Sequence, residues 1–413
     1  MRSNRLDRQL RIEGWNQQVL ENAKVGVVGD NDLLASLYLM SASVLGINNM
    51  VVLAPVLDFK LVEIAKKLNP SFTLTHMEGF YTHPVMAELF KACDLIVDLS
   101  HYGLANKLLI EKGYRDKIPI IRGFCYEHNG EQGLKVFTYV RGREWQEIEQ
   151  LISPSHFPNG HFDDGVLDTI ITGITLDETK NILMGFGVSE KLISYKKAKK
   201  TTVQSRPKIL VVGSGALGNF VGVGLAYSGF RHITFMDPDV IEMTNLNRQV
   251  LFYDAIGRSK AETLAERLNS IFNMAGKAQV SYFDKDTDIT AYDVVFDCVD
   301  NFESRIVLSE KCKVQGKILI SGGTSVDAGQ IVIYNPMKNG VTPSELLGLY
   351  DIVKERSPET YQRERAACIY QPDPSVIMTN QITAGFMVDT YRMLLDGQDP
   401  GNIFYDSNNK ERF

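Results

Sequence analysis

The sequence predicts an α/β fold built from two homologous doubly wound domains, residues 1–200 and 201–413. In the second half, the apolar run Lys208–Val212 is followed by a glycine-rich turn, by apolar residues at helical spacing, and by another apolar run that ends at Asp237. The first half repeats this order from Lys24, beginning Lys-Val-Gly-Val-Val-Gly. Since each copy indicates one mostly parallel sheet, we expect two Rossmann-like domains packed as a pseudo-dimer within one chain.

The glycine-rich turn of the second half has the composition of a phosphate-binding loop. Gly213, Gly215 and Gly218 would let backbone N–H groups approach a phosphate at the N-terminus of the following helix. Asp237, at the end of the next strand, can accept hydrogen bonds from ribose hydroxyls. This pattern alone fits any nucleotide-binding α/β sheet, and a purely structural tight turn is the other interpretation that it allows.

The residues that follow are more specific. Asp237-Pro-Asp-Val-Ile-Glu-Met-Thr-Asn-Leu-Asn-Arg-Gln precedes Gly-Arg-Ser-Lys and then Asp-Cys-Val-Asp-Asn. Here the chain resembles the ubiquitin-activating enzymes and their ThiF-type bacterial relatives, which adenylate the C-terminus of a small protein. The resemblance implies that the three loop glycines bind ATP and that nearby cations offset the charge of the triphosphate. It also implies that the carboxylate of Asp300 holds Mg²⁺. The other residues that it implies are Asp237, Asn245, Arg248 and Lys260.

The N-terminus resembles an arginine-bearing arm of the same family. Arg5-Leu-Asp-Arg-Gln-Leu-Arg11, called the arm below, is followed by Gly14 and Trp15. In the family the second arginine reaches the ATP site of a partner domain, which implies that role for Arg8. The second half has no arm before Lys208, so the two halves would complete one site between them. A solvated basic residue on a first helix is the alternative interpretation of Arg8.

The first copy of the repeat lacks the residues that would bind ATP. Its glycine loop is replaced by Asp30-Asn-Asp-Leu-Leu34, whose acids would repel a phosphate. Ala54 stands at the position of Asp237, and His101 at that of Asp300. We therefore expect the first half to keep the scaffold without binding ATP.

Cys368 is the candidate nucleophile. In ubiquitin-type members of the family, a cysteine on the segment before the last helix takes the acyl group as a thioester, and Cys368 stands at the matching place. Its neighbours Ala366 and Ile369 depart from the proline and threonine of the family pattern, and a buried inert cysteine is the alternative. Cys298 and Cys312 are expected in the core.

Three further expectations concern the framework. The lysine-rich stretch of residues 191–207 is predicted to be a solvated linker between the halves. Helices are expected over about residues 177–184 and, at the matching place, over about residues 385–395, together with an apolar helical stretch over residues 376–387. Residues 399–413 are predicted to add a short edge strand.

Composition limits the classes of function. The 413 residues carry a net charge of −6 at pH 7, which gives no support for a nucleic-acid partner. No apolar run has the length of a membrane span, so no membrane is expected. Five cysteines, an odd number without Cys-x-x-Cys pairs, favour a reducing cytoplasm and predict no zinc site.

These features together predict ATP-dependent activation of a ubiquitin-like protein that ends in glycine. Adenylation would be followed by a thioester on Cys368 and by transfer to a conjugating enzyme, in a chain that needs no second copy. A sulfur-carrier protein or a ribosomal peptide could use the same ATP site, whereas the acidic balance disfavours a tRNA base. A nicotinamide-dinucleotide oxidoreductase would leave Arg8, Arg248 and Asp300 without a role. A non-catalytic scaffold fits the first half only.

Overall fold

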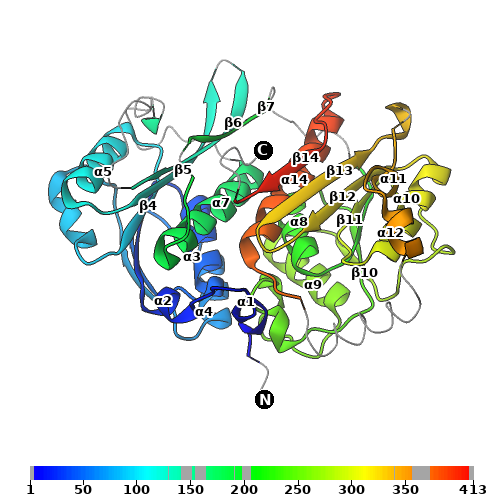
Figure 1. The fold of residues 1–413 in the computed structure, drawn as a ribbon, viewed down its shortest axis with the longest axis horizontal. Coiled ribbons are helices and arrows are strands. Elements are labelled where there is room, and N and C mark those ends of the chain that lie inside the picture. The colour runs from blue at the N-terminus through cyan, green and yellow to red at the C-terminus, as the bar shows by residue number, and fades with distance from the viewer. Residues whose placement is uncertain are drawn as a thin grey trace. The chain divides into compact units, whose positions relative to one another are not determined.

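The computed structural model describes residues 4–128, 130–140, 151–153, 164–189, 191–197, 206–338, 340–355 and 373–408. The chain forms two compact units (Figure 1). One comprises Met1–Glu13 and Thr201–Tyr405, and the other comprises Gly14–Lys200 and Asp406–Phe413. The arm therefore belongs to the unit that contains the glycine-rich loop of the second half.

The unit of the first half contains a mixed seven-stranded sheet. Its strands are β1 (Lys24–Gly29), β2 (Asn49–Leu53), β3 (Thr73–Met77), β4 (Leu95–Leu99), β5 (Ile120–His128), β6 (Glu131–Tyr139) and β7 (Ile193–Lys197). They lie in the order β3-β2-β1-β4-β5-β6-β7. The first five strands pair in parallel, and β5, β6 and β7 pair antiparallel.

The sheet of the second half has the same arrangement. Its strands are β8 (Ile209–Val212), β9 (Ile233–Met236), β10 (Lys277–Gln279), β11 (Val294–Asp297), β12 (Ile318–Thr324), β13 (Ala328–Tyr334) and β14 (Ile403–Asp406). They lie in the order β10-β9-β8-β11-β12-β13-β14, with β12 and β13 antiparallel. The predicted α/β class with one doubly wound sheet in each half is confirmed, and so is the short edge strand near the C-terminus.

The linker prediction is wrong for residues 193–197, which form β7 instead. Ile193 and Lys197 are buried and the residues between them are not, so this strand places two side chains on the covered face of the sheet. β6 presents an open edge with which β7 pairs, and this partner is distant in sequence. The lysine-rich composition therefore indicated a linker where tertiary pairing forms a strand.

Six helices in the described part of the first half connect its strands. They are α2 (Gln17–Asn22), α3 (Asp32–Leu45), α4 (Phe59–Leu68), η1 (Pro84–Phe90), α5 (Gly103–Asp116) and α7 (Gly165–Met184). The predicted start of α7 at residue 177 is wrong, because Asp164 caps the helix and it runs for 20 residues. Threonines reduce the helical signal of its first half, yet hydroxyls such as that of Thr172 donate to the carbonyl four residues earlier, here that of Asp168.

The described part of the second-half unit contains the helices α1 (Asp7–Leu10), α8 (Ala216–Tyr227), η2 (Met243–Asn245), η3 (Val250–Phe252), α9 (Lys260–Phe272), α10 (Phe302–Gln315), η4 (Pro336–Lys338), α11 (Pro343–Leu346), α12 (Leu349–Glu355) and α14 (Ile377–Leu395). Of these, α8, α9, α10 and α14 follow the strands in the same order as α3, α4, α5 and α7 of the first half, and shorter helices accompany them. α14 covers both helical stretches expected here, residues 376–387 and about 385–395, and its residues are buried through Arg392. Within the described ranges, no helix combines the length and apolar character required to cross a bilayer.

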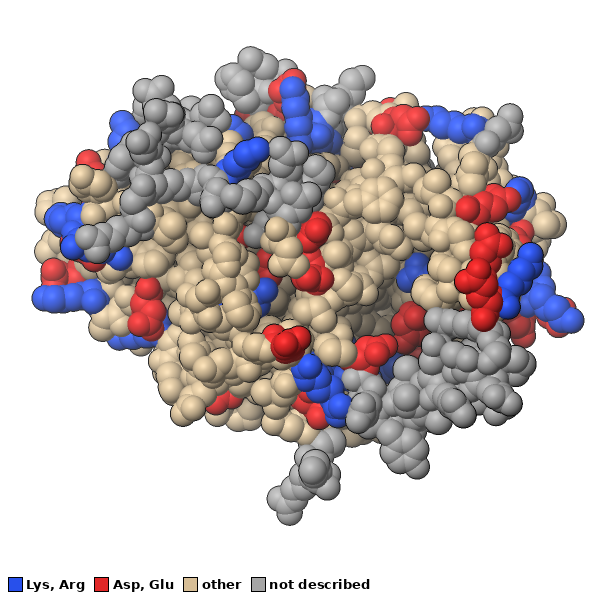
Figure 2. Space-filling view, viewed as in Figure 1, with Lys and Arg blue, Asp and Glu red and all other residues tan. Residues whose placement is uncertain are grey.

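Charged side chains of both signs share the surface. Figure 2 shows acidic and basic groups interspersed over the face in view. Several form exposed pairs, such as Lys338 with Asp399 at 2.9 Å. Such pairs contribute little to stability, so the fold depends on the buried contacts described below.

Candidate nucleotide-binding site

The glycine loop of the second half connects β8 to α8. Gly213 has a φ of +92°, and a side-chain carbon on it would lie 2.5 Å from the carbonyl oxygen of Cys298. A side-chain carbon on Gly218 would overlap the carbonyl oxygen of Gly213. At Gly215, however, the nearest such contact is Nε2 of Gln249 at 3.8 Å. The fold thus requires glycine at two of the three positions, and the third leaves open space of the kind that a phosphate needs.

Asp237 follows β9 directly and lies beside this loop. Its buried carboxylate accepts from the N–H of Ser214 at 2.7 Å and from the N–H of Asp239 at 2.9 Å. Burial raises the pKa of Asp237, and the charge of Lys260 opposes this shift. Lys260 donates to the carboxylate of Asp239 at 2.8 Å. The structure therefore brings Asp237 and Lys260 together beyond the carboxyl end of β9.

Asn245 is held within its own turn. Its side-chain oxygen accepts from the N–H of Glu242 at 2.9 Å, and the side chain of Glu242 accepts from the N–H of Asn245. The side chain is buried. The structure thus gives Asn245 a capping role, and its contact with a nucleotide stays a prediction.

Arg248 lies buried near two other predicted site residues. Its Nη1 donates to the carbonyl oxygen of Thr244 at 3.0 Å and to Oδ1 of Asn247 at 2.7 Å. Burial and then the positive charge of Arg8 lower the pKa of Arg248 to about 9, while the charge of Asp300 opposes this shift. The structure therefore brings Arg8, Arg248 and Asp300 within electrostatic reach of one another, although they come from distant parts of the chain.

The arm joins this unit through two adjacent residues. Nη1 of Arg8 donates to the carbonyl oxygen of Asp373 at 3.0 Å. Gln9 is fully buried, and its Oε1 lies 3.4 Å from the Nδ2 of Asn247, which donates to it. Asn247 also donates to the carbonyl oxygen of Ser375 at 3.0 Å. Sequence analysis gave Asn247 no role, although it stands directly before the arginine of the same run.

Asp300 is exposed on the loop after β11, and it forms no hydrogen bond or ion pair with the described residues. The loop itself is held by Arg305 of α10, which donates to the carbonyl oxygen of Val299 at 2.6 Å. Arg305 also pairs with the buried carboxylate of Asp297 at 3.3 Å. Sequence analysis missed this pair, because a buried ion pair leaves no periodic signal in the sequence.

Asp300 suits a magnesium ion that is bound together with ATP. Mg²⁺ in such sites takes one or two protein carboxylates and completes its shell with phosphate oxygens and water. One exposed carboxylate beside the glycine loop fits that requirement. In the part of the chain that the structure describes, no three histidine, cysteine, aspartate or glutamate side chains are grouped so as to hold a metal by themselves.

The cysteines divide into two groups. Cys368 lies outside the described residues, so its role as a nucleophile stays a prediction. Cys298, directly after β11, and Cys312, within α10, are buried, which confirms their expected place in the core. Burial raises the pKa of Cys298 and raises that of Cys312 to about 12. Neither thiol would ionise near neutral pH, and the thiolate is the reactive form of cysteine.

The comparison with known families gives this geometry a context. A model described as the ThiF family matches residues 189–409, which is more than half of the chain. The chain belongs to the ThiF family. The matched region includes the glycine loop, Asp237, Arg248, Lys260 and Asp300.

Individual relatives of this ThiF-family chain match it over shorter regions. The adenylyltransferase and sulfurtransferase MOCS3 of Xenopus laevis is 34% identical over 137 residues, which cover 32% of this chain and 30% of that protein. MOCS3 of Anopheles gambiae is 35% identical over 219 residues, covering 51% and 46%. The chain thus spans less than half the length of these curated relatives. A crystal structure of E. coli MccB with ATP matches 49% of this chain and 62% of that chain, at 22% identity and a TM-score of 0.41.

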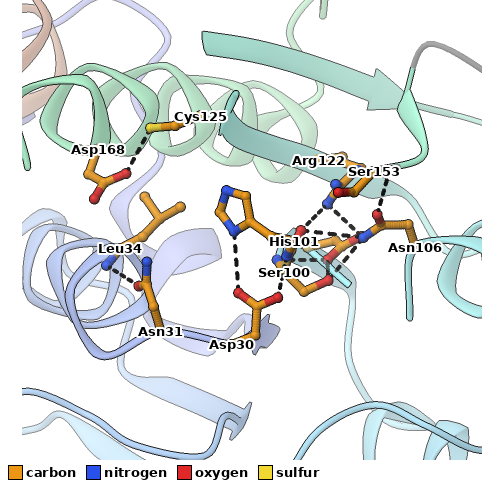
Figure 3. Close-up of polar contacts among 11 residues, drawn as sticks. Asp30, Asn31, Leu34, Ser100, His101, Asn106, Arg122, Cys125, Ser153 and Asp168 are labelled. Carbon is orange, nitrogen blue, oxygen red and sulfur yellow. Dashed lines mark hydrogen bonds and ion pairs between the residues drawn. The ribbon is translucent and has the colours of Figure 1, made fainter. Parts of the chain in front are cut away.

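In the first half, side chains of the protein itself occupy the equivalent end of the sheet (Figure 3). Oδ1 of Asn31 accepts from the N–H of Leu34 at 2.9 Å and so caps α3. The carboxylate of Asp30 accepts from the N–H of His101 and lies 3.2 Å from its Nδ1. A phosphate at this loop would have to displace both contacts. The ThiF-type loop of the second half has no comparable side chain, because Gly215 stands where Asn31 stands here.

Substitution of Gly215 tests whether the open space at this residue is used to bind a ligand. We expect Gly215→Val to abolish MgATP binding measured by calorimetry, with a smaller loss of unfolding free energy than Gly213→Val, since Gly215 has a negative φ of −69°. Gly213→Val is the matched contrast. It should destabilise the unit by about 1–3 kcal/mol or more, because it forces a β-branched residue to a φ of +92°. Tight MgATP binding by Gly215→Val would show that the loop does not carry phosphate.

His101 makes the first-half unit sensitive to acid. Burial and the charge of Arg122 lower the pKa of His101 to about 3, so the unfolded chain binds a proton more readily than the folded one. The resulting stability is present above pH 6.5 and falls as the pH is lowered toward 3. Between pH 6.5 and 5 we expect a loss of about 2 kcal/mol in the unfolding free energy of this unit. Thermal melts of wild type and His101→Asn measure this difference, and equal pH slopes would contradict the assignment.

Proposed function

We propose that this chain binds MgATP at the glycine loop of the second half and adenylates the C-terminal carboxylate of a small ubiquitin-like protein. The observation that carries the proposal is the pair of Arg8 and Arg248. Burial lowers the pKa of both guanidinium groups, and their charges repel each other. Neither forms an ion pair with another described residue. Arg248 is buried and Arg8 is half-buried, and two cations within electrostatic reach of each other favour an anion with several oxygens, such as a triphosphate.

The residues have distinct tasks in this reaction. A carboxylate oxygen of the substrate attacks the α-phosphorus of ATP, a new P–O bond forms, and the bond to pyrophosphate breaks. N–H groups of the loop hold phosphate oxygens, and each carboxylate oxygen of Asp237 keeps a lone pair for a ribose hydroxyl. Arg8 and Arg248 offset the charge that is redistributed during the transfer. Magnesium, when bound through Asp300, supplies further charge compensation at the phosphates.

We also propose that the arm acts within its own chain, which makes the two halves a pseudo-dimer. The grouping of Met1–Glu13 with Thr201–Tyr405 in one compact unit supports this. The relatives named as adenylyltransferases support the reaction class. The word sulfurtransferase in the same names favours a sulfur-carrier protein as the second candidate substrate. Either substrate would present a flexible C-terminal tail, and a ubiquitin-like modifier would require Cys368 and a conjugating enzyme afterwards.

Exchange of labelled pyrophosphate into ATP tests the first step. The assay uses a panel of small proteins that end in Gly-Gly, and we expect exchange that depends on one of them. Asp300→Ala should reduce this exchange by about 10²–10³, the loss typical of one electrostatic contact to the transferred group. Its fold should be intact, because Asp300 is exposed and has no described partner.

Asp286→Ala is the matched control, since this exposed aspartate lies on the loop before β11. It should exchange like wild type. An Asp300→Ala protein that exchanges like wild type would overturn the metal assignment.

Mixing Asp300→Ala with Arg8→Ala tests whether the arm acts within its own chain. Neither chain has an intact site if the arm acts within its own chain, so recovered exchange in the mixture would contradict the pseudo-dimer.

Cys368→Ala separates the two chemical steps. The thiol would displace AMP only after the adenylate has formed, so the variant should keep full pyrophosphate exchange. It should lose an adduct with the small protein that is sensitive to reducing agent and visible on a gel. Cys312→Ala is the control and should keep the adduct, because this thiol is buried. An adduct that survives in Cys368→Ala would place the thioester elsewhere.

A further inference from the structure

We propose that Asn247 is a positioning residue that fastens both the arm and the chain before α14 to the nucleotide site. The proposal rests on the proposed function for the identity of the nucleotide and goes beyond it by naming what holds Arg8 in place. Asn247 is fully buried, and its side-chain amide contacts three separate parts of the unit. These parts are the arm, the residues that lead into α14, and Arg248.

The hydrogen-bond partners leave one orientation for this amide. Nη1 of Arg248 can only donate, so the group 2.7 Å from it must be the amide oxygen of Asn247. The carbonyl oxygen of Ser375 can only accept, so the group 3.0 Å from it must be the amide nitrogen. The same nitrogen donates its second hydrogen to Oε1 of Gln9 at 3.4 Å. The amide nitrogen therefore joins two segments that are distant in sequence, and the amide oxygen holds the neighbouring Arg248.

A second contact joins the same two segments. Arg8 donates to the carbonyl oxygen of Asp373, two positions before Ser375, at 3.0 Å. The arm thus meets the chain before α14 at Arg8 and, through Asn247, at Gln9. Helix α1 has only four residues, too few to be stable alone, so its contacts with the rest of the unit, these two among them, hold the arm in place.

This arrangement links the nucleotide site to the segment that carries the candidate nucleophile. Cys368 stands five positions before Asp373 in the sequence. A displacement of residues 373–375 would break the acceptors used by Arg8 and Asn247, and Arg248 would lose the orientation that Asn247 supports. We infer that the two arginines are in place only while residues 373–375 are. The position of this segment thereby controls the affinity of the site for ATP.

A double-mutant cycle separates positioning from general stability. The probe is MgATP, and its affinity is measured by calorimetry on the full chain. Gln9→Met keeps the size of the side chain and removes its amide. We expect it to weaken MgATP binding about three- to tenfold, and Arg8→Ala to weaken it about tenfold or more. Because Gln9 acts through Arg8, Gln9→Met should add nothing further in the Arg8→Ala background.

Arg11→Ala is the matched control on the arm. Its guanidinium pairs with Asp7 at the surface at 2.9 Å, so MgATP affinity should be unchanged. A purely structural role for Gln9 predicts the same loss of affinity in both backgrounds, and that result would overturn the proposal. So would unchanged MgATP affinity in Asn247→Ala, which removes the amide from all three partners.

Limited trypsin digestion gives a readout that does not depend on nucleotide. We expect Asn247→Ala to be cleaved after Arg8 at least about threefold faster than wild type, because the arm loses the contact between Gln9 and Asn247. Asn269→Ala is the control, since this side chain bonds the backbone of Gly276 on another loop of the same unit. Equal cleavage rates in Asn247→Ala and wild type would overturn the proposal. If wild type fails to bind MgATP, the proposed function fails, and the digestion still decides whether Asn247 holds the arm.

Discussion

In each half of this protein, one buried ion pair at the end of a central strand holds the loop that follows that strand. In the second half, Asp297 of β11 pairs with Arg305 of α10, and in the first half Asp98 of β4 pairs with Arg122 of β5 at 3.1 Å. Removing either partner of such a pair would leave an uncompensated buried charge, which costs about 3–5 kcal/mol. The loop that follows each strand is therefore held in one conformation.

The two halves obtain the same pairing from different positions. Eight residues after the aspartate, the second half has Arg305 and the first half has Asn106. On the neighbouring strand, the second half has a serine opposite the aspartate, and the first half has Arg122. Both arginines also donate to a backbone carbonyl of the loop after the strand, that of Val299 or of Ser100. The arginine comes from helix α10 in the second half and from strand β5 in the first half, but its contacts with the aspartate and the loop are present in both.

The two halves differ in the side chains that lie next to these loops. In the second half the loop after the strand presents an exposed carboxylate, and the glycine loop keeps open space over Gly215. In the first half His101 and Asp30 fill the corresponding space with their own contact. The side chains that differ here between the halves are not the ones that form the buried ion pairs, so both sheet ends keep the same framework.

The sequence by itself determined the α/β class, the internal repeat and the groups of residues around the glycine loop, because strand–turn–helix order and motif spacing are local properties. It also separated the two halves, since Asp30 and Ala54 stand where the other copy has Ser214 and Asp237. Only the tertiary structure decided that residues 193–197 form a strand, that Arg305 and Asp297 pair, and that Asn247 joins Gln9 to Ser375. The strand and the contacts of Asn247 depend on partners far along the chain, and the Arg305–Asp297 pair depends on both groups being buried together. A single sequence carries no signal for which groups become neighbours once water is excluded.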